Sequence, residues 1–187
     1  MTKIAISGNI AAGKSVVENF LKESGFTVYD TDIMAHEILE NSNEIKLAFK
    51  DYDIVSDGKI DRKKLGAIVF QNSELKSILE QIIHPQIRNK IENLYSSAPI
   101  FIAVPLLFEA NMQDLFDKII FVTADEKIRL ERLMERNSLT KEEALLRIHA
   151  QENEENKIKQ SDFIIYNNTD LVSLKNQLSK VLHKLQY

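Results

Sequence analysis

Short runs of apolar residues recur along the chain and are separated by long stretches with the spacing of helices. The runs are rich in Ile, Val and Phe, and most show no alternation of apolar and polar positions. Continuous apolar strands between helices are typical of a parallel sheet that is covered on both faces. The pattern predicts an α/β fold with a five-stranded parallel sheet, whose strands are residues 3–7, 26–29, 100–104, 118–123 and 163–166.

The long segment between the second and third predicted strands shows no convincing buried strand. Its apolar positions have helical spacing, with a break or kink expected at Pro85 and a turn at Asp57-Gly58. The segment is too long for a crossover connection, so we expect a helical substrate-binding subdomain inserted in the sheet. Its predicted helices are residues 33–39, 45–49, 63–70 and 74–95.

Two further features complete the predicted layout. The first helix should begin near Gly13 and end at Ser24-Gly25, where glycine suits a C-terminal cap. Residues 126–160 are highly charged and have helical spacing, which predicts a second helical insert.

The composition is ordinary for a soluble globular protein, with 44% hydrophobic and 28% charged residues in a chain of 187. No apolar run approaches the roughly 20 residues of a membrane-spanning helix. The first strand leaves no room for a signal peptide, which predicts a cytoplasmic protein without a membrane partner. The absence of cysteine excludes disulfides, thiolate metal sites and a cysteine nucleophile. The net charge of −4 at pH 7 argues against a general nucleic-acid binder.

A phosphate-binding signature follows the first strand. Residues 8–15 read GNIAAGKS and match G-x-x-x-x-G-K-[ST] between a strand and a helix, as this motif requires. In such a loop, backbone N–H groups and the helix N-terminus hold a triphosphate. Lys14 would reach the β- and γ-phosphates, and the Ser15 hydroxyl would bind Mg²⁺. The predicted ATP-binding residues here are Gly8, Asn9, Ile10, Ala11, Ala12, Gly13, Lys14, Ser15 and Val16.

Two classes of phosphate-loop protein are disfavoured. Residues 167–170 resemble the guanine-reading N-K-x-D sequence only superficially, because Asn168 occupies the lysine position, and no D-x-x-G glycine lies in the middle of the chain. Pro105 stands where the strand of a Walker B sequence would end in a carboxylate. A small-molecule kinase is therefore favoured over a GTPase switch and a mechanical ATPase.

Two carboxylates follow the second strand. Asp30 and Asp32 flank Thr31, and residues i and i+2 of an extended segment point to one side. Ligands of open parallel sheets lie beyond the carboxyl ends of the strands, so both carboxylates should face a γ-phosphate. We expect Asp32 to be the base that orients an acceptor hydroxyl, with Asp30 supporting it or the metal's water shell. On local sequence alone, Asp32 could equally cap the helix at residues 33–39.

Three arginines, Arg129, Arg132 and Arg136, are spaced to lie on one face of a helix. Arg147 lies on the next helix, for which residues 140–143 offer a capping box. Two arginine-bearing helices joined by a short turn predict a lid that closes over phosphates and excludes water. The alternative is a solvated face whose arginines pair with the interspersed glutamates.

In this order, these segments resemble the dephospho-CoA kinase family of P-loop small-molecule kinases, and the resemblance runs nearly end to end. The P-loop alone indicates a superfamily, whereas the other motifs in their correct order are highly specific. They are YDTDIMAHEI (29–38), similar to D-A-D-x-x-A-[RH]; IIHPQIR (82–88), similar to H-P-x-I-R; VPLLFE (104–109), similar to P-L-L-F-E; the arginine segment (129–151); and SDFIIYNN (161–168).

The resemblance implies ATP-dependent phosphorylation of the 3′-hydroxyl on the ribose of dephospho-CoA, which gives coenzyme A and ADP as the last step of coenzyme A synthesis. It implies Mg²⁺ as cofactor, ATP and dephospho-CoA as small-molecule partners, and a monomer or weak oligomer. It also implies a nucleotide-binding core (1–30, 99–125 and 161–187), a helical CoA-binding domain (31–98) and a lid (126–160).

Residue roles follow from the same resemblance. It implies catalytic roles for Asp32, Lys14, Arg132 and Arg136, with Arg136 and Asn167 also contacting ATP. Helix packing remains the alternative for His84, and structural roles remain the alternatives for Phe108 and Glu109. The residues expected to bind dephospho-CoA are Asp30, Asp32, His84, Arg88, Phe108, Glu109 and Arg147.

Some positions depart from the family's pattern. Asn9 and Ala11-Ala12 stand where the family often has Gly and Gly-Ser, but alanines still donate backbone N–H groups. Thr31 replaces an alanine, Arg129 stands at a frequent glutamine position, and Asn137 replaces a common aspartate. Two alternative functions stay open: another P-loop nucleoside or nucleotide kinase, and a nucleotide-binding regulator without acceptor chemistry.

Overall fold

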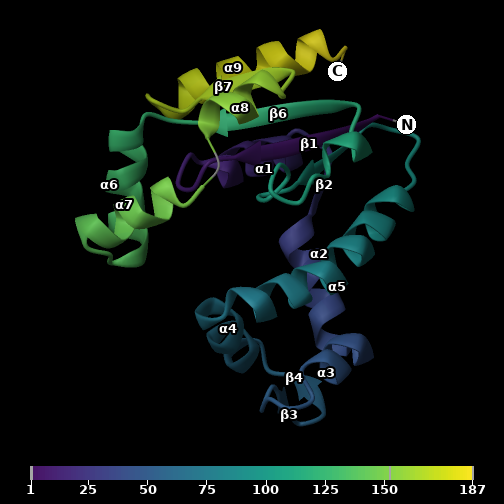
Figure 1. Ribbon diagram of the computed structural model, residues 1–187. Helices are drawn as coiled ribbons and strands as arrows, with labels where there is room; N and C mark the ends of the chain where they lie inside the picture. Colours follow the sequence, from purple (N-terminus) through teal and green to yellow (C-terminus); the bar gives the residue numbers. More distant parts are fainter. Residues whose placement is uncertain (1, 152, 187) are drawn as a thin grey trace. The chain divides into compact units, whose positions relative to one another are not determined.

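The computed structural model describes residues 2–151 and 153–186. The chain divides into two compact units, Met1–Tyr29 with Ser96–Tyr187, and Asp30–Tyr95. The first unit carries the sheet and the charged helices, and the second is the helical insert (Figure 1).

Five parallel strands form the sheet, in the order β2-β5-β1-β6-β7. In this register Ile4 of β1 lies beside Phe101 of β5 and Lys118 of β6. The predicted α/β fold with a five-stranded parallel sheet is confirmed, and the strands have nearly the predicted bounds. They are β1 (Lys3–Gly8), β2 (Thr27–Asp30), β5 (Ile100–Ala103), β6 (Lys118–Thr123) and β7 (Phe163–Tyr166).

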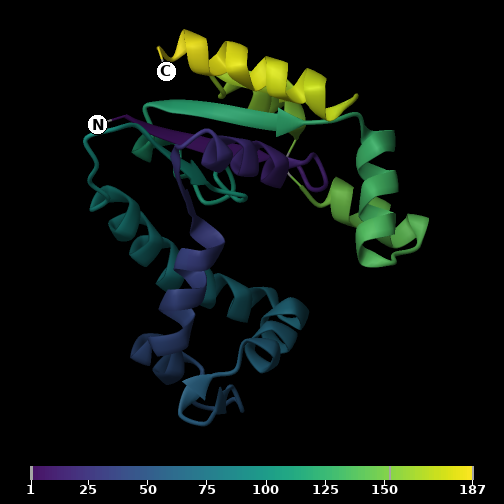
Figure 2. The ribbon, with the colours of Figure 1, turned by 180° about the vertical axis from the view of Figure 1, so that it is seen from behind.

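Two helices, α1 (Lys14–Glu23) and α9 (Leu171–Lys184), pack side by side on one face of the sheet (Figure 2). The helix α1 has the predicted bounds, with Gly13 before it and Ser24 as its C-cap. Alternate strand residues such as Ile4 and Ile6 are buried against these helices, and each such side chain contributes about 1.5–3 kcal/mol relative to exposure. This core supports the loop between β1 and α1.

The insert contains four helices and a short hairpin among its described residues. The insert has no long buried strand, as expected, and the hairpin adds two strands of only two residues each. Its turn lies at the predicted Asp57-Gly58, with φ of 51° and 77°, the left-handed values of a tight hairpin turn. The elements are α2 (Thr31–Asn41), α3 (Asn43–Ala48), β3 (Val55–Ser56), β4 (Lys59–Ile60), α4 (Arg62–Gln71) and α5 (Ser73–Glu92).

Short polar side chains begin the helices of the insert. Asp61 accepts hydrogen bonds from two N–H groups at the start of α4, at 2.9 and 3.2 Å. Asn72 does the same for α5, at 2.9 and 3.1 Å, and Ser42 caps α3. These bonds satisfy N–H groups that have no partner within the helix, and those to Asp61 hold the pKa of its carboxyl below the ordinary value.

The helix α5 continues through Pro85, so the chain does not break there, and the predicted alternative of a kink stays a prediction. Proline leaves the carbonyl of Gln81 without its helical partner. Both residues are exposed, so water can satisfy that carbonyl. Among the described helices, α5 included, none is long and apolar enough to cross a membrane.

The charged segment of the first unit contains α6 (Glu126–Asn137), α7 (Lys141–His149) and α8 (Glu154–Lys159). A one-turn 3₁₀ helix, Gln113–Leu115, precedes β6. The predicted capping box of α7 is confirmed: Thr140 N–H donates to Glu143 at 2.8 Å, and Glu143 N–H donates to Thr140 Oγ1 at 3.3 Å. The hydrogen bond from the Thr140 backbone N–H and, to a lesser extent, one from the Thr140 side chain lower the pKa of the Glu143 carboxyl.

Replacing Thr140 with Ala should raise the pKa of Glu143 toward its ordinary value, because the hydrogen bond between the Thr140 side chain and the Glu143 carboxyl is lost while the backbone N–H remains. A lowered carboxyl pKa means that the box stabilises α7 above the unfolded-state pKa and that this stability disappears as pH falls through the folded-state pKa. NMR titration of the Glu143 carboxyl measures the shift, and amide exchange in α7 follows the fraying. Ser42→Ala removes a cap in the other unit and should leave Glu143 unchanged; an unchanged Glu143 pKa in Thr140→Ala would contradict the prediction.

Candidate active site

The loop at residues 8–15 comes very close to neighbouring chain segments. A Cβ atom on Gly8 would lie 2.5 Å from the carbonyl oxygen of Val122 in β6. Gly13 has a φ of 95°, and a Cβ atom there would lie 2.2 Å from Nδ2 of Asn167. Both positions therefore require glycine, which accounts for the two glycines of the signature.

The loop presents free backbone donors at the start of α1. Asn9 N–H donates to the Val122 carbonyl at 3.2 Å, which ties the loop to β6. The N–H groups of Gly13, Lys14 and Ser15 have no acceptor among the residues that the structure describes. The first turn of α1 contains no acidic residue, so these donors at the positive end of the helix dipole form an anion site.

Asn167, at the end of β7, holds the loop from the other side. Its N–H donates to the Thr123 carbonyl at 2.8 Å, and its Nδ2 donates to the Ala12 carbonyl at 2.9 Å. Its own carbonyl accepts from Nη2 of Arg132 at 3.1 Å. Asn167 therefore links β6, the loop and α6, while its contact with ATP stays a prediction.

The polar side chains of the loop's last turn differ in exposure. The Lys14 ammonium lies 2.6 Å from the Glu18 carboxylate, whereas Ser15 is exposed. Val16 packs against the apolar core. In the described ranges no group of three or more His, Cys, Asp or Glu residues could hold a metal ion. The assignment of Ser15 as a ligand of Mg²⁺ stays a prediction.

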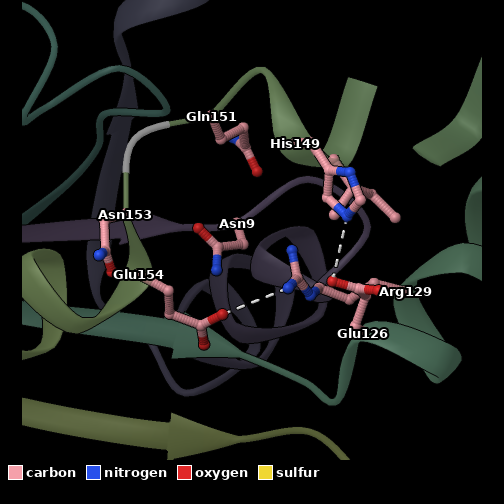
Figure 3. A pocket seen from close by; sticks show the side chains of 8 residues that line it. Asn9, Glu126, Arg129, His149, Gln151, Asn153 and Glu154 are labelled. Carbon is pink, nitrogen blue, oxygen red and sulfur yellow. Dashed lines mark hydrogen bonds and ion pairs between the residues drawn. The ribbon is translucent and has the colours of Figure 1, made fainter. Parts of the chain in front are cut away.

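A polar cavity of about 190 Å³ lies beside the loop, within the first unit (Figure 3). Oδ1 of Asn9 lines it, is buried, and has no hydrogen-bond partner in the described part of the chain. Gln151 also lines it and accepts a hydrogen bond from the N–H of Ile10 at 2.8 Å. The cavity therefore adjoins the phosphate loop, and one acceptor of the loop, Asn9 Oδ1, lies beside it and is unused by the described residues.

An ion pair and a histidine–glutamate contact form the other side of this cavity, as the dashed lines of Figure 3 show. His149 lies 3.4 Å from Glu126, and Arg129 lies 3.2 Å from Glu154. Arg129 is only 5% exposed, and its Nε donates to the Ala124 carbonyl at 2.8 Å. Glu154 also hydrogen-bonds the Thr123 hydroxyl. Arg129 is thus a buried structural residue that joins the starts of α6 and α8.

The other arginines of this segment remain more accessible. Arg132 is half-buried, and its Nη1 is a buried donor without a partner among the described residues. Arg136 is exposed and donates to Asn137 at 2.9 Å, and Arg147 is exposed on α7. No ion pair joins these three arginines to the interspersed glutamates within the ranges described. The predicted lid arginines are therefore available for a ligand, but their roles stay predictions.

The loop after β5 is held by a buried ion pair. Lys157 of α8 is 2% exposed, and its ammonium lies 2.6 Å from Oε1 of Glu109. Oε2 of Glu109 is buried without a partner among the described residues. Phe108 is 3% exposed and packs edge-on against Phe121, with ring centroids 5.9 Å apart. The structure gives both residues a packing role, and their contact with an acceptor stays a prediction.

The local geometry at Asp30 and Asp32 differs from the expectation. The assumption of an extended segment through both residues is wrong, because α2 begins at Thr31. Asp30 is the cap, accepting a hydrogen bond from the Asp32 N–H at 2.8 Å. Asp32 lies exposed in the first turn of α2. The capping alternative therefore applies to Asp30, and a base role for Asp32 stays a prediction.

The remaining predicted acceptor residues lie on α5. His84 and Arg88 are half-buried and four residues apart, so they share one face of this helix. A separate cavity of about 340 Å³ lies between α2, β4 and the start of α4. Lys59 pairs with Glu40 at its edge, which lowers the pKa of that carboxyl. Its lining residues are Ile33, His36, Glu37, Glu40, Lys59, Ile60 and Arg62.

Several residues at the site escaped the sequence prediction. Two of them contact the phosphate loop, namely Glu18 and Gln151. The other two are Glu154, which pairs with Arg129, and Lys157, which pairs with Glu109 of the P-L-L-F-E segment. Only Glu18 had a local signal, because it lies four residues after Lys14. The other three contact residues that are distant in sequence, which no periodicity can reveal.

Replacing Lys157 with Met should lower the free energy of unfolding by about 3 kcal/mol, because the Glu109 carboxylate, one oxygen of which is buried, loses its counter-ion. Urea denaturation measures the change, and Lys157→Arg, which keeps the charge, should retain most of the stability. Lys64→Met removes the cation of an exposed pair with Asp53 and should cost less than about 1 kcal/mol. Equal small losses in both Met variants would contradict the importance of burial.

Comparison with known proteins gives a match over most of the chain. A family model described as "Dephospho-CoA kinase" matches residues 2–173. A dephospho-CoA kinase of Listeria innocua is 38% identical over 185 residues, covering 94% of this chain and 92% of the relative. A dephospho-CoA kinase of Carboxydothermus hydrogenoformans is 40% identical over 194 residues, covering 98% of this chain and 94% of the relative.

A solved structure supports the same relationship. The dephospho-CoA kinase from Campylobacter jejuni has a TM-score of 0.74 and 33% sequence identity, and the match covers 98% of this chain and 96% of that one. The fold, the phosphate loop and the matched residues 2–173 agree, and this chain belongs to the dephospho-CoA kinase family.

Proposed function

We propose that this protein transfers the γ-phosphoryl group of ATP to the 3′-hydroxyl on the ribose of dephospho-CoA, giving coenzyme A and ADP. The observation that carries the proposal is the family match over residues 2–173, which includes the loop with three free N–H donors. The phosphate loop explains the binding of ATP, which supplies the phosphoryl group. The family match explains the choice of dephospho-CoA as the molecule that receives it.

The nucleotide would lie on the loop at residues 8–15. N–H groups of Gly13, Lys14 and Ser15 can bind phosphate oxygens without moving, because none has another acceptor in the described chain. The Lys14 ammonium would contact the β- and γ-phosphates, and the Ser15 hydroxyl would bind Mg²⁺. When bound, that ion bridges phosphate oxygens and neutralises charge as it develops.

Positive charge on the lid would stabilise the transferred group. Residues 126–160 are proposed as the lid, and Arg132, Arg136 and Arg147 are its candidate phosphate ligands. The buried Nη1 of Arg132 has no partner in the described residues, so a phosphate oxygen would satisfy it. A closed lid would also exclude water, which protects ATP from hydrolysis.

The acceptor would bind through the helical insert, proposed as the CoA-binding domain at residues 31–98. Asp32 would orient the ribose hydroxyl and take its proton late in the transfer, while Asp30 holds the start of α2 by capping it. His84, Arg88, Phe108 and Glu109 would contact or order the acceptor site.

The proposal extends to the partners of the protein and its place in the cell. Two small molecules, ATP and dephospho-CoA, are the proposed partners of a cytoplasmic monomer or weak oligomer. A net charge of −4 at pH 7 argues against a nucleic-acid partner, because binding nucleic acid needs an excess of cations on one surface.

ADP release with Mg²⁺ and ATP should be strong with dephospho-CoA and weak with other acceptors. The panel holds AMP, CMP, UMP, adenosine and a blank without acceptor, and mass spectrometry identifies the phosphorylated product. Turnover with a nucleoside or nucleotide instead would contradict the acceptor assignment but leave the phosphate loop's role intact. No turnover with any acceptor would favour a nucleotide-binding regulator.

Replacing Asp32 with Asn should lower kcat by about 10²- to 10⁴-fold, because the amide cannot accept the hydroxyl proton. Affinity for ADP should stay within about twofold, since Asp32 is assigned to the acceptor. Asp51→Asn, an exposed change in the same unit, serves as the matched control with wild-type turnover. A turnover number within a few-fold of wild type would exclude the base role.

A further inference from the structure

A buried carboxylate on α1 lies outside the phosphate-loop signature. Glu18 is only 6% exposed and lies one helical turn after Lys14. Its Oε1 is 2.6 Å from the Lys14 ammonium, its ion-pair partner among the described residues. A carboxylate buried to this extent is unusual unless it is paired. The lysine assigned to the phosphates is therefore already engaged.

Helix stability does not account for this pair. Lys14 is the first residue of α1, where the positive end of the helix dipole disfavours a cation. Lysine followed by glutamate at i, i+4 is also the weaker of the two possible orders. The pair lies beside the free N–H donors at the start of α1, where the position of the lysine bears on phosphate binding.

Phosphate and Glu18 would compete for the same ammonium. If Lys14 turned fully to a phosphate, the Glu18 carboxylate would be left buried without its cation, which is unfavourable. If Lys14 contacted both, the carboxylate would still lie near the negative polyphosphate and repel it. Both effects lower the affinity of the loop for phosphate.

We infer that Glu18 is a positioning residue that holds Lys14 in the empty loop and weakens the binding of phosphate-bearing nucleotides. The inference rests on the nucleotide half of the proposed function and not on the identity of the acceptor. Weaker binding of ADP favours its release, because Glu18 takes back the ammonium when the product leaves. Release of product limits turnover in many well-evolved enzymes, so such a residue would affect kcat as well.

The test is a binding titration of the full chain with ADP and with inorganic pyrophosphate. Glu18→Gln keeps the shape of the side chain and removes its charge, so both dissociation constants should fall about three- to tenfold, the scale of one coupled charged pair. Glu18→Ala should move them in the same direction. Glu23→Gln removes the same charge from an exposed position on α1 and should leave both constants unchanged.

A double-mutant cycle separates an effect through Lys14 from a simple effect of charge. In a Lys14→Met background, Glu18→Gln should change the ADP dissociation constant by less than about twofold. Steady-state kinetics should show a lower KM for ATP together with a lower kcat in Glu18→Gln. Thermal unfolding of each variant identifies any change that reflects loss of folding.

Three results would overturn the inference. They are unchanged or weaker ADP binding in Glu18→Gln, an equal gain of affinity in the Lys14→Met background, and a wild-type protein that binds neither probe. The last of these would also overturn the nucleotide half of the proposed function. Because no acceptor is used, a kinase acting on something other than dephospho-CoA would give the expected result unchanged.

Discussion

The close approach of the phosphate loop to the ends of β6 and β7 is the constraint on which the rest of the first unit depends. Gly8 leaves no room for a Cβ atom beside Val122, and Gly13 leaves none beside Asn167. Asn9 and Asn167 then fix the loop to the sheet by hydrogen bonds. With the backbone held this way, the N–H groups at the start of α1 stay free for an anion, because no segment nearby can accept from them.

Two charge pairs with buried cations fix the charged helices to the rest of the first unit. Arg129 joins α6 to Glu154 at the start of α8, and Lys157 of α8 holds Glu109 after β5. Both cations are almost fully buried, so loss of either partner would leave a charge that water cannot solvate. A short helix of only six residues is thus fixed at two points, which its own hydrogen bonds could not achieve.

The parts of the fold that the sequence predicted correctly are those set by local patterns. The five strands are continuous apolar runs. The loop signature is a local sequence that determines the backbone conformation of the loop, and the Thr140 capping box lies within four residues. The features that local patterns did not specify are those that depend on the surroundings of a residue in the folded chain. A two-residue strand is too short for periodicity, and Pro85 is tolerated in α5 because that face is exposed. Asp30, and not Asp32, caps α2 because β2 ends at Asp30, and the sequence pattern does not specify that end point.

Three polar atoms in the described part of the first unit are buried without the hydrogen bonds that such atoms normally make. They are Asn9 Oδ1 on the loop, Arg132 Nη1 on α6 and Glu109 Oε2 after β5, all buried without a partner among the described residues. Leaving one such group unsatisfied costs about 1–3 kcal/mol, so water or a ligand must supply the missing bonds. Arg129 and Lys157, by contrast, are paired and buried, and a ligand would have to break an ion pair to use them. The paired cations therefore hold the fold of this site, whereas each unsatisfied atom still needs water or a ligand as its partner.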